Sequence, residues 1–403
     1  MKYFIKAFGC RLNQYYADYF SNAVVFNGNR IVESEFEADV VAIASCVVTH
    51  KAERDIRHYV SHVKRINPLA KIVVFGCYPK YRYLEDIYAA GGLSEVFSRL
   101  GLEDPGCLIK PIFRVRTNIR VQEGCNFRCS YCIVPFVRGP SKSRSEEEIM
   151  KEIKNVVSNG AVEIVLTGIQ TGEWGREWGK RISYLIKNIK DQFPELRIRL
   201  SSISPIHVKK DVIELLKEGY VLPHLHLPIQ HGSEKVLKEM RRPYKLEYYV
   251  NLVNNLVAEV RNIAIGTDVI VGFPTETEQD FEESYNLISA LPFAYMHVFE
   301  FSPREGTPAA RLSSLNSEVV RKRKQKLLDL AKEKKKQFLL NQIGKVMGGV
   351  VETRELDYYS ATGDNYVKIH LPLKYNLKSG QVVKIKVESS YDNFVTGLLA
   401  EAI

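Results

Sequence analysis

The sequence lacks a long apolar run. No uninterrupted apolar stretch reaches the roughly 18 residues that a membrane-spanning helix needs, so we expect no transmembrane helix and no membrane partner. Residues 1–6 become polar too quickly for the apolar core of a secretory signal peptide. We therefore expect a cytoplasmic protein whose cysteines stay reduced.

Cysteine is scarce, with seven residues in a chain of 403. An odd count argues against a framework made only of disulfides. A single C-x2-C pair occurs, and no second pair or nearby histidine completes the four ligands of a structural zinc site. The scarcity therefore disfavours both a disulfide-stabilised fold and a closed zinc site.

Three of the cysteines, however, lie together in the spacing C-x3-C-x2-C, at Cys125, Cys129 and Cys132. One short loop can place three thiolates on three irons of a 4Fe–4S cluster, which usually takes four cysteines. The fourth iron then stays open to a reactant. The alternative, three buried structural cysteines, would require this spacing to arise by chance.

Positive charge exceeds negative charge, giving a formal net charge of +10 and a pI of about 9.0. Residues 321–336 alone hold nine basic and two acidic residues. Such a concentration favours a polyanionic partner such as nucleic acid. The competing interpretation is the solvated face of a basic helix, and composition does not decide between them.

Apolar runs alternate with helix-like segments, which predicts an α/β fold. Residues 3–8, 38–44 and 72–75 have the pattern of buried parallel strands, and Cys10, Cys46 and Cys77 follow them closely. The carboxyl ends of parallel strands lie along one edge of the sheet, where ligands bind. The three cysteines should therefore converge as a second three-thiolate metal site.

The alternation resumes after residue 118. The expected strands are residues 119–122, 163–167, 197–201, 222–227, 264–271 and 296–301. Six strands with intervening helices predict a partial (β/α)6 barrel, with the C-x3-C-x2-C loop at its carboxyl-terminal face. Polar residues at strand ends are candidates for cofactor contacts; these are Thr167, Gly168, Ser202, Gln230 and Asp268. His224 and His226 should share one face of a strand, as ligand contacts or as buried core histidines.

A basic helix over residues 317–342 precedes a small all-β barrel. Its expected strands are residues 346–352, 366–371, 381–387 and 394–399. Aromatic and lysine side chains there could bind RNA or simply decorate the surface; they are Tyr358, Tyr359, Tyr366, Lys368 and Lys374. Residues 98–113 are expected to be a linker, with Cys107 incidental. The domains predicted are residues 1–112, 113–335 and 336–403.

Motifs throughout the chain resemble those of the radical S-adenosylmethionine (radical SAM) methylthiotransferases. In the N-terminal part they are Gly9-Cys10-Arg11-Leu12-Asn13-Gln14-Tyr15, residues 46–53 and Gly76-Cys77-Tyr78. In the central part they include residues 124–141, 226–230, 266–274 and 301–308. The last part resembles a TRAM domain, a small RNA-binding barrel. Two departures, Ala44-Ser45 and Tyr78-Pro79-Lys80, leave the cysteines intact.

The resemblance implies an enzyme with two 4Fe–4S clusters and S-adenosylmethionine, acting on tRNA with an electron donor such as a flavodoxin or ferredoxin. The resemblance does not identify the sulfur donor. The residues after Cys10 and Cys46 are most similar to the branch that adds a 2-methylthio group to threonylcarbamoyladenosine next to the anticodon. Arg138 and Arg304 are then candidates for binding the carboxylate of that nucleoside. The alternatives are the isopentenyladenosine branch and a non-enzymatic iron–sulfur or zinc RNA-binding protein.

Overall fold

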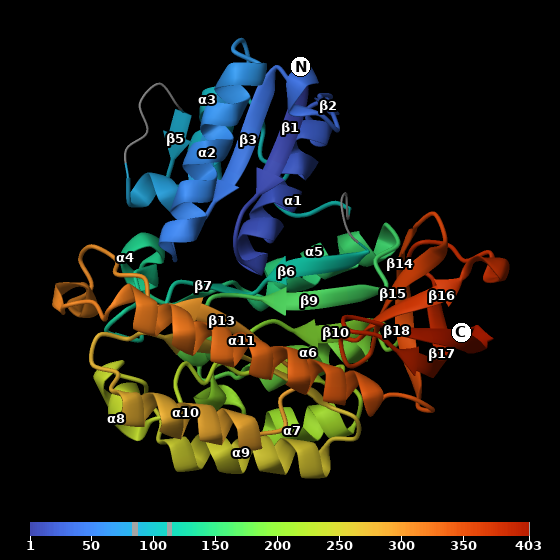
Figure 1. Ribbon diagram of the computed structural model, residues 1–403. Helices are drawn as coiled ribbons and strands as arrows, with labels where there is room; N and C mark the ends of the chain where they lie inside the picture. The colour runs from blue at the N-terminus through green and yellow to red at the C-terminus, as the bar shows by residue number, and fades with distance from the viewer. Residues whose placement is uncertain (83–87, 111–114, 403) are drawn as a thin grey trace. The chain divides into compact units, whose positions relative to one another are not determined.

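The computed structural model describes residues 1–82, 88–110 and 115–402 (Figure 1). The chain divides into two compact units. The N-terminal unit consists of residues 1–126, 132–161 and 167–169. The C-terminal unit consists of residues 127–131 and 162–166, and of the chain from residue 170 onward. All seven cysteines lie in described parts, and all are thiols.

A parallel sheet with the strand order β2-β1-β3-β4-β5 forms the centre of the N-terminal unit. Its strands are β1 (Lys2–Ala7), β2 (Arg30–Ile31), β3 (Val40–Ser45), β4 (Lys71–Gly76) and β5 (Tyr88–Ala90). The three predicted strands are confirmed, whereas β2 and β5 are too short to leave a hydrophobic pattern. The order reverses between β1 and β3, and sheets of this kind bind ligands outside the carboxyl ends of their strands.

Helices cover both faces of this sheet. The helices are α1 (Arg11–Phe26), α2 (His50–Ile66), α3 (Leu93–Leu100) and α4 (Val134–Arg138). On one face Phe20 of α1 and Phe97 of α3 pack with Phe75 of β4. On the other face, Ile56 of α2 and Val137 of α4 share a core. Burial of these apolar faces accounts for the helices, since such contacts supply most of helical stability.

The remainder of the N-terminal unit contains β6 (Arg116–Arg120), β7 (Gln122–Glu123), β8 (Lys142–Ser143) and α5 (Glu146–Ser158). Ser145 and Glu148 form a capping box that starts α5. The expected linker over residues 98–113 is wrong at its start, because α3 continues to Leu100; residues 111–113 lie outside the described residues. Cys107 is buried, and Asn155 of α5 donates to its sulfur.

The C-terminal unit begins with parallel strands that alternate with helices. The strands are β9 (Glu163–Thr167), β10 (Arg197–Leu200), β11 (His224–His226), β12 (Ala264–Val271) and β13 (Tyr295–Glu300). The helices are α6 (Ile182–Gln192), α7 (Lys210–Lys217), α8 (Glu234–Glu239), α9 (Leu246–Glu259) and α10 (Glu278–Ala290). β9 pairs with β10, β12 pairs with both β11 and β13, and a bridge from Ser202 to His226 connects the two groups. This confirms the predicted barrel-like α/β architecture.

The last part of the chain is a closed five-stranded barrel with the order β14-β15-β16-β18-β17. Its strands are β14 (Val346–Arg354), β15 (Tyr358–Gly363), β16 (Lys368–Pro372), β17 (Val382–Ser390) and β18 (Val395–Ala402). β15 was not predicted, because Ser360 and Gly363 obscure its hydrophobic pattern. Tyr359 of β15 is a core residue and not a surface aromatic. No helix in the described parts of the chain is long and apolar enough to cross a membrane.

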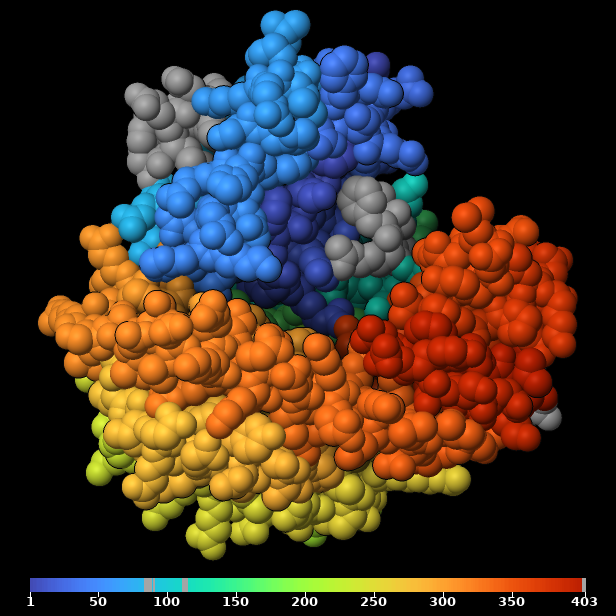
Figure 2. Space-filling view, viewed as in Figure 1, coloured from blue at the N-terminus to red at the C-terminus, as the bar shows by residue number. Residues whose placement is uncertain are grey.

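The basic helix α11 (Ser317–Leu340) lies along the surface of the C-terminal unit, where Figure 2 shows it in orange. Part of its charge is used inside the unit. Arg323 forms ion pairs with Glu276 and Glu278, and the Lys334 ammonium donates to the carbonyls of Ser289 and Leu291. The basic side chains of the predicted segment that remain exposed are Arg321, Lys322, Lys326, Lys332 and Lys336. These side chains are the most accessible to an external partner.

Candidate functional site

Cys10, Cys46 and Cys77 follow the carboxyl ends of three neighbouring strands. In the parallel register, Ala7 of β1 pairs with Ala44 of β3, and Ala44 pairs with Phe75 of β4. Cys46 and Cys77 come directly after β3 and β4, and Cys10 is the N-cap residue of α1. The three cysteines therefore lie along the same edge of the sheet, as expected, and their role as metal ligands stays a prediction.

The three thiols are close enough to influence one another electrostatically. Burial raises the pKa of Cys46 to about 12, and the neighbouring Cys10 and Cys77 thiolates add to the rise. Gly9 has a φ of 88°, and a Cβ there would lie 2.6 Å from the Cβ of Cys46. Only glycine lets the backbone pass so close. A thiolate-only donor set that needs a cation to offset repulsion between its members fits an iron–sulfur cluster.

Arg138, the last residue of α4, contacts this triplet. Its Nε donates to the Cys77 sulfur at 3.0 Å, its Nη1 to Glu123 at 2.7 Å, and its Nη2 to Asn13 at 2.6 Å. The Asn13 amide in turn donates to the Ser45 carbonyl at 2.9 Å. Burial lowers the pKa of Arg138, but the Cys77 and Glu123 charges outweigh burial and raise it. The guanidinium is thus held as a cation beside a thiol.

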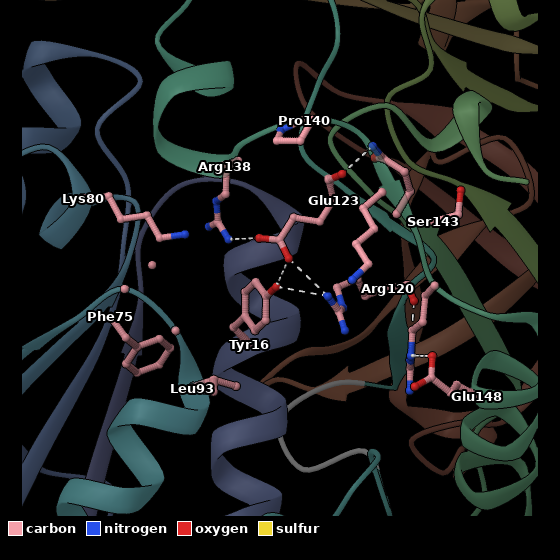
Figure 3. A pocket seen from close by; sticks show the side chains of 16 residues that line it. Tyr16, Phe75, Lys80, Leu93, Arg120, Glu123, Arg138, Pro140, Ser143 and Glu148 are labelled. Atoms are coloured by element: carbon pink, nitrogen blue, oxygen red, sulfur yellow. Dashed lines mark hydrogen bonds and ion pairs between the residues drawn. The ribbon is translucent and has the colours of Figure 1, made fainter. Parts of the chain in front are cut away.

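A cavity of about 530 Å³ adjoins this network. Figure 3 shows the Glu123 carboxylate between Arg138, Tyr16 and Arg120, with dashed lines to each. The basic lining residues are Lys80, Arg120, Arg138, Lys142 and Arg144, and the acidic ones are Glu123 and Glu148. Burial raises the pKa of Glu123, but Arg138 and the Tyr16 hydroxyl outweigh burial and lower it. The cavity is therefore predominantly basic.

The second triplet, Cys125, Cys129 and Cys132, occupies a loop whose shape depends on the residue before it. Gly124 has a φ of 75°, and a Cβ there would lie 1.9 Å from the Pro140 carbonyl oxygen. Directly after it, the Cys125 N–H donates to the Gly139 carbonyl at 3.1 Å. This close approach fixes the start of the loop, and no side chain can be accommodated at residue 124.

The middle cysteine of the loop lies in the C-terminal unit, where it also has an arginine neighbour. Arg242 Nη1 lies 3.4 Å from the Cys129 sulfur. The adjacent Ser130 donates its N–H to the Met240 carbonyl and its hydroxyl to the Glu239 carbonyl. No motif in the sequence marks Arg242, because it follows the short helix α8 more than a hundred residues from the loop.

Of the residues predicted to contact the cofactor, only Thr167 and Gly168 lie at a strand end, that of β9. Ser202 and Gln230 lie in the loops after β10 and β11, and the expected strand-end position of Asp268 is wrong, because β12 continues to Val271. Thr167 ends β9 and is buried, and a Cβ at Gly168 would lie 2.9 Å from the Gln122 carbonyl. Ser202 is exposed, and Gln230 is held at a φ of 70° by a backbone bridge to Val269. Their roles stay predictions.

Asp268, the remaining candidate, lies in a histidine cluster. His226 Nε2 and His297 Nδ1 approach the same carboxylate oxygen, at 3.0 and 3.1 Å. Burial raises the pKa of Asp268, but these two hydrogen bonds outweigh burial and lower it to about 2. His224 and His226 share a face of β11, as predicted, and both contact the Tyr295 hydroxyl. His297 was not predicted from the sequence; the signal that marks it is its alternation with Tyr295 on β13.

Arg304 lies in the segment after β13 and is almost fully buried, with 1% of its surface exposed. Its carbonyl accepts from the Thr307 N–H and hydroxyl, which form a tight turn before the next helical segment. Arg138, the other arginine predicted to bind substrate, also has a buried side chain. The structure therefore places both arginines away from the surface.

Comparison with known proteins defines the class of protein first. Residues 119–288 match the Radical SAM superfamily, and residues 2–96 match the family described as Uncharacterized protein family UPF0004. A solved structure of the radical S-adenosylmethionine methyltransferase TsrM from Kitasatospora setae has a TM-score of 0.55 at 13% identity and covers 77% of each chain. That likeness shows the fold alone.

Curated relatives then identify the family. The chain is 32% identical to threonylcarbamoyladenosine tRNA methylthiotransferase MtaB of Bacillus subtilis (strain 168), over 94% of this chain and 92% of the relative. The MtaB protein of Aquifex aeolicus (strain VF5) is 33% identical over 92% and 96%. A tRNA-2-methylthio-N(6)-dimethylallyladenosine synthase of a Hydrogenobaculum strain is 30% identical over 82% and 84%. The chain belongs to the radical SAM methylthiotransferase family.

The dependence of the second loop on Gly124 can be tested by Gly124→Ala. The added Cβ would collide with the Pro140 carbonyl in a backbone conformation that alanine avoids, so we expect the variant to lose the cluster predicted at Cys125, Cys129 and Cys132. Iron per chain after anaerobic reconstitution should fall by about one cluster. Gly139→Ala, where a Cβ meets nothing within 4 Å, is the matched control for strained glycine conformation. A parental iron content in Gly124→Ala would contradict the argument.

Proposed function

We propose that this protein adds a 2-methylthio group to threonylcarbamoyladenosine in tRNA. The observation that carries the proposal is the presence of two separate cysteine triplets, one at the edge of the N-terminal sheet and one in the loop after β7. Sulfur insertion into an unreactive C–H bond needs both a radical source and a sulfur carrier. The names of the most similar relatives support the choice of nucleoside.

Cys125, Cys129 and Cys132 would hold the cluster that binds S-adenosylmethionine, and Cys10, Cys46 and Cys77 would hold the auxiliary cluster. When bound, the two clusters and S-adenosylmethionine supply the electron, the radical, the inserted sulfur and the methyl group. The protein holds the thiolates, shields them from water and counters their charge. Arg138 counters the charge at Cys77, and Arg242 counters the charge at Cys129. Thr167, Gly168, Ser202, Gln230 and Asp268 stay proposed contacts of S-adenosylmethionine.

The small barrel and α11 would bind the tRNA outside the modified nucleoside. On the barrel surface, rings stack from Tyr358 to His370 at 3.7 Å and from His370 to Phe394 at 3.8 Å. Tyr391 ends the series and is 53% exposed. Since three of the rings already stack on one another, Tyr391 is the member best placed to stack on a base. Exposed lysines of α11 would bind phosphates.

The threonylcarbamoyl group carries a carboxylate, whereas the isopentenyl group is apolar. A buried carboxylate needs a cationic or donor-rich partner, and Arg138 and Arg304 remain the proposed partners. Each guanidinium nitrogen of Arg138 already contacts the protein, so a substrate carboxylate would have to displace one of its present acceptors. We further propose three domains with boundaries near residues 112 and 335, a cytoplasmic location and reduction by a flavodoxin or ferredoxin.

Removing a cysteine from each triplet should have separable effects. Cys129→Ala should abolish formation of 5′-deoxyadenosine, because two thiolates do not hold the open cluster. Cys46→Ala should keep that reaction but abolish methylthiolation. Anaerobic assays of both products, with iron counts, measure the two effects. Parental methylthiolation by Cys46→Ala would contradict the role of the auxiliary cluster.

The exposed charge of α11 should hold tRNA through phosphates. Changing Lys322, Lys332 and Lys336 to Gln should weaken binding broadly and reduce the salt slope by about 0.7–0.9 for each phosphate that is no longer neutralised. Lys334→Gln is the control, because it should cost about 1–3 kcal/mol of unfolding free energy and leave affinity unchanged. Filter binding across salt concentrations and urea denaturation make the comparison. If the salt dependence of tRNA binding were unchanged in the triple variant, these lysines would be solvated surface residues that do not contact phosphates.

Substrate choice tests the proposal directly. In a competition assay, tRNAs carrying threonylcarbamoyladenosine and isopentenyladenosine are mixed at equal concentration and the nucleosides are analysed by mass spectrometry. We expect methylthiolation of the threonylcarbamoyl form to dominate. Equal or preferential methylthiolation of the isopentenyl form would overturn the choice of nucleoside and leave the family membership intact.

A further inference from the structure

We infer that Arg138 is a positioning residue that sets the reduction potential of the auxiliary cluster through its contact with Cys77. The inference rests on the auxiliary cluster of the proposed function. The Arg138 Nε lies 3.0 Å from the Cys77 sulfur, and the Arg138 side chain is only 3% exposed. Hydrogen bonds to cysteine sulfur and buried charge are the means by which a protein adjusts the potential of an iron–sulfur cluster.

The Arg138 guanidinium is held in one orientation because each of its three nitrogens donates a hydrogen bond. Nη1 donates to Glu123 and Nη2 donates to Asn13, so only Nε is directed at the sulfur. Asn13 is itself fixed, because its amide donates to the carbonyls of Phe8 and Ser45 at the sheet edge. The guanidinium cannot turn away from Cys77 without breaking its hydrogen bonds to Glu123 and Asn13.

The backbone that carries Arg138 is equally restrained. α4 starts two residues after Cys132 and ends at Arg138. Ile133 and Val137 are buried in the core that also contains Cys77 and Tyr78. A single short segment therefore carries a ligand of one cluster and the cation beside the other.

The cation near Cys77 is only partly neutralised. Glu123 accepts from Arg138, but it also accepts from Arg120 and from the Tyr16 hydroxyl. One carboxylate is thus shared by two guanidinium groups at the wall of a basic cavity (Figure 3). The residual positive charge favours the reduced cluster, which carries one more electron than the oxidised cluster. Arg138 should therefore raise the potential, and Glu123 should lower it.

The test uses the full chain with Cys125, Cys129 and Cys132 changed to Ala, so that only the auxiliary cluster is present. Its midpoint potential is measured anaerobically by electron paramagnetic resonance, with iron per chain as a second readout. Arg138→Gln should shift the potential in the negative direction. Glu123→Gln should shift it in the positive direction, because it leaves the guanidinium without its carboxylate. Arg138→Lys, which keeps the charge, should restore part of the shift.

Arg120→Gln is the matched control. It removes the same charge from the same carboxylate in the same cavity, but Arg120 has no described contact with a sulfur. Its shift should be smaller than that of Arg138→Gln. Equal potentials in Arg138→Gln and the parent, with or without a lower iron content, would make Arg138 a purely structural residue. A parent that binds no iron at Cys10, Cys46 and Cys77 would overturn the auxiliary cluster itself, and this role with it.

Discussion

Three thiolates held in one site repel one another, and the N-terminal unit is arranged to keep them together. The parallel register of β1, β3 and β4 brings their carboxyl ends into line, so that Cys10, Cys46 and Cys77 meet at one edge. Burial also disfavours the thiolate form, since it raises the pKa of Cys46 and Cys77. Without a cluster these cysteines therefore stay protonated and neutral, and cluster binding must both displace their protons and offset the repulsion between the thiolates.

An arginine beside one sulfur in each triplet is the other part of this compensation. Arg138 donates to Cys77 from a buried fork, and Arg242 lies near Cys129 and over the ring of Tyr244. A guanidinium suits such a place because it keeps its proton when buried and can satisfy several acceptors at once. The two contacts differ in length, 3.0 against 3.4 Å. The triplet of Cys10, Cys46 and Cys77 therefore has the closer and more restrained cation.

The sequence predicted those residues of the site that directly follow parallel strands, because parallel strands end at a common edge of the sheet. Cys46 could be placed because it directly follows a strand of six buried residues. Arg242 and His297 could not be placed, because each reaches its partner through tertiary packing of elements distant in sequence. β15 was not predicted, because its small residues show little of the apolar–polar alternation that marks a strand. Arg138 was noticed, but its environment depends on a carboxylate and an amide that only the fold brings together.

The distribution of positive charge shows why net charge alone says little about how this chain binds RNA. Arg197 and Arg199 pair with Glu163 on the neighbouring strand, and Arg199 also donates to the carbonyls of Gly363 and Asp364 at the small barrel. Arg323 and Lys334 likewise serve interior acceptors. These cations fix the β barrel and α11 against the strand–helix core within the C-terminal unit. Among the basic residues of α11, those at exposed positions are left for a polyanion, and they are carried by a helix whose other basic residues hold it in place. Internal ion pairing thus determines which basic residues of this helix remain available to RNA.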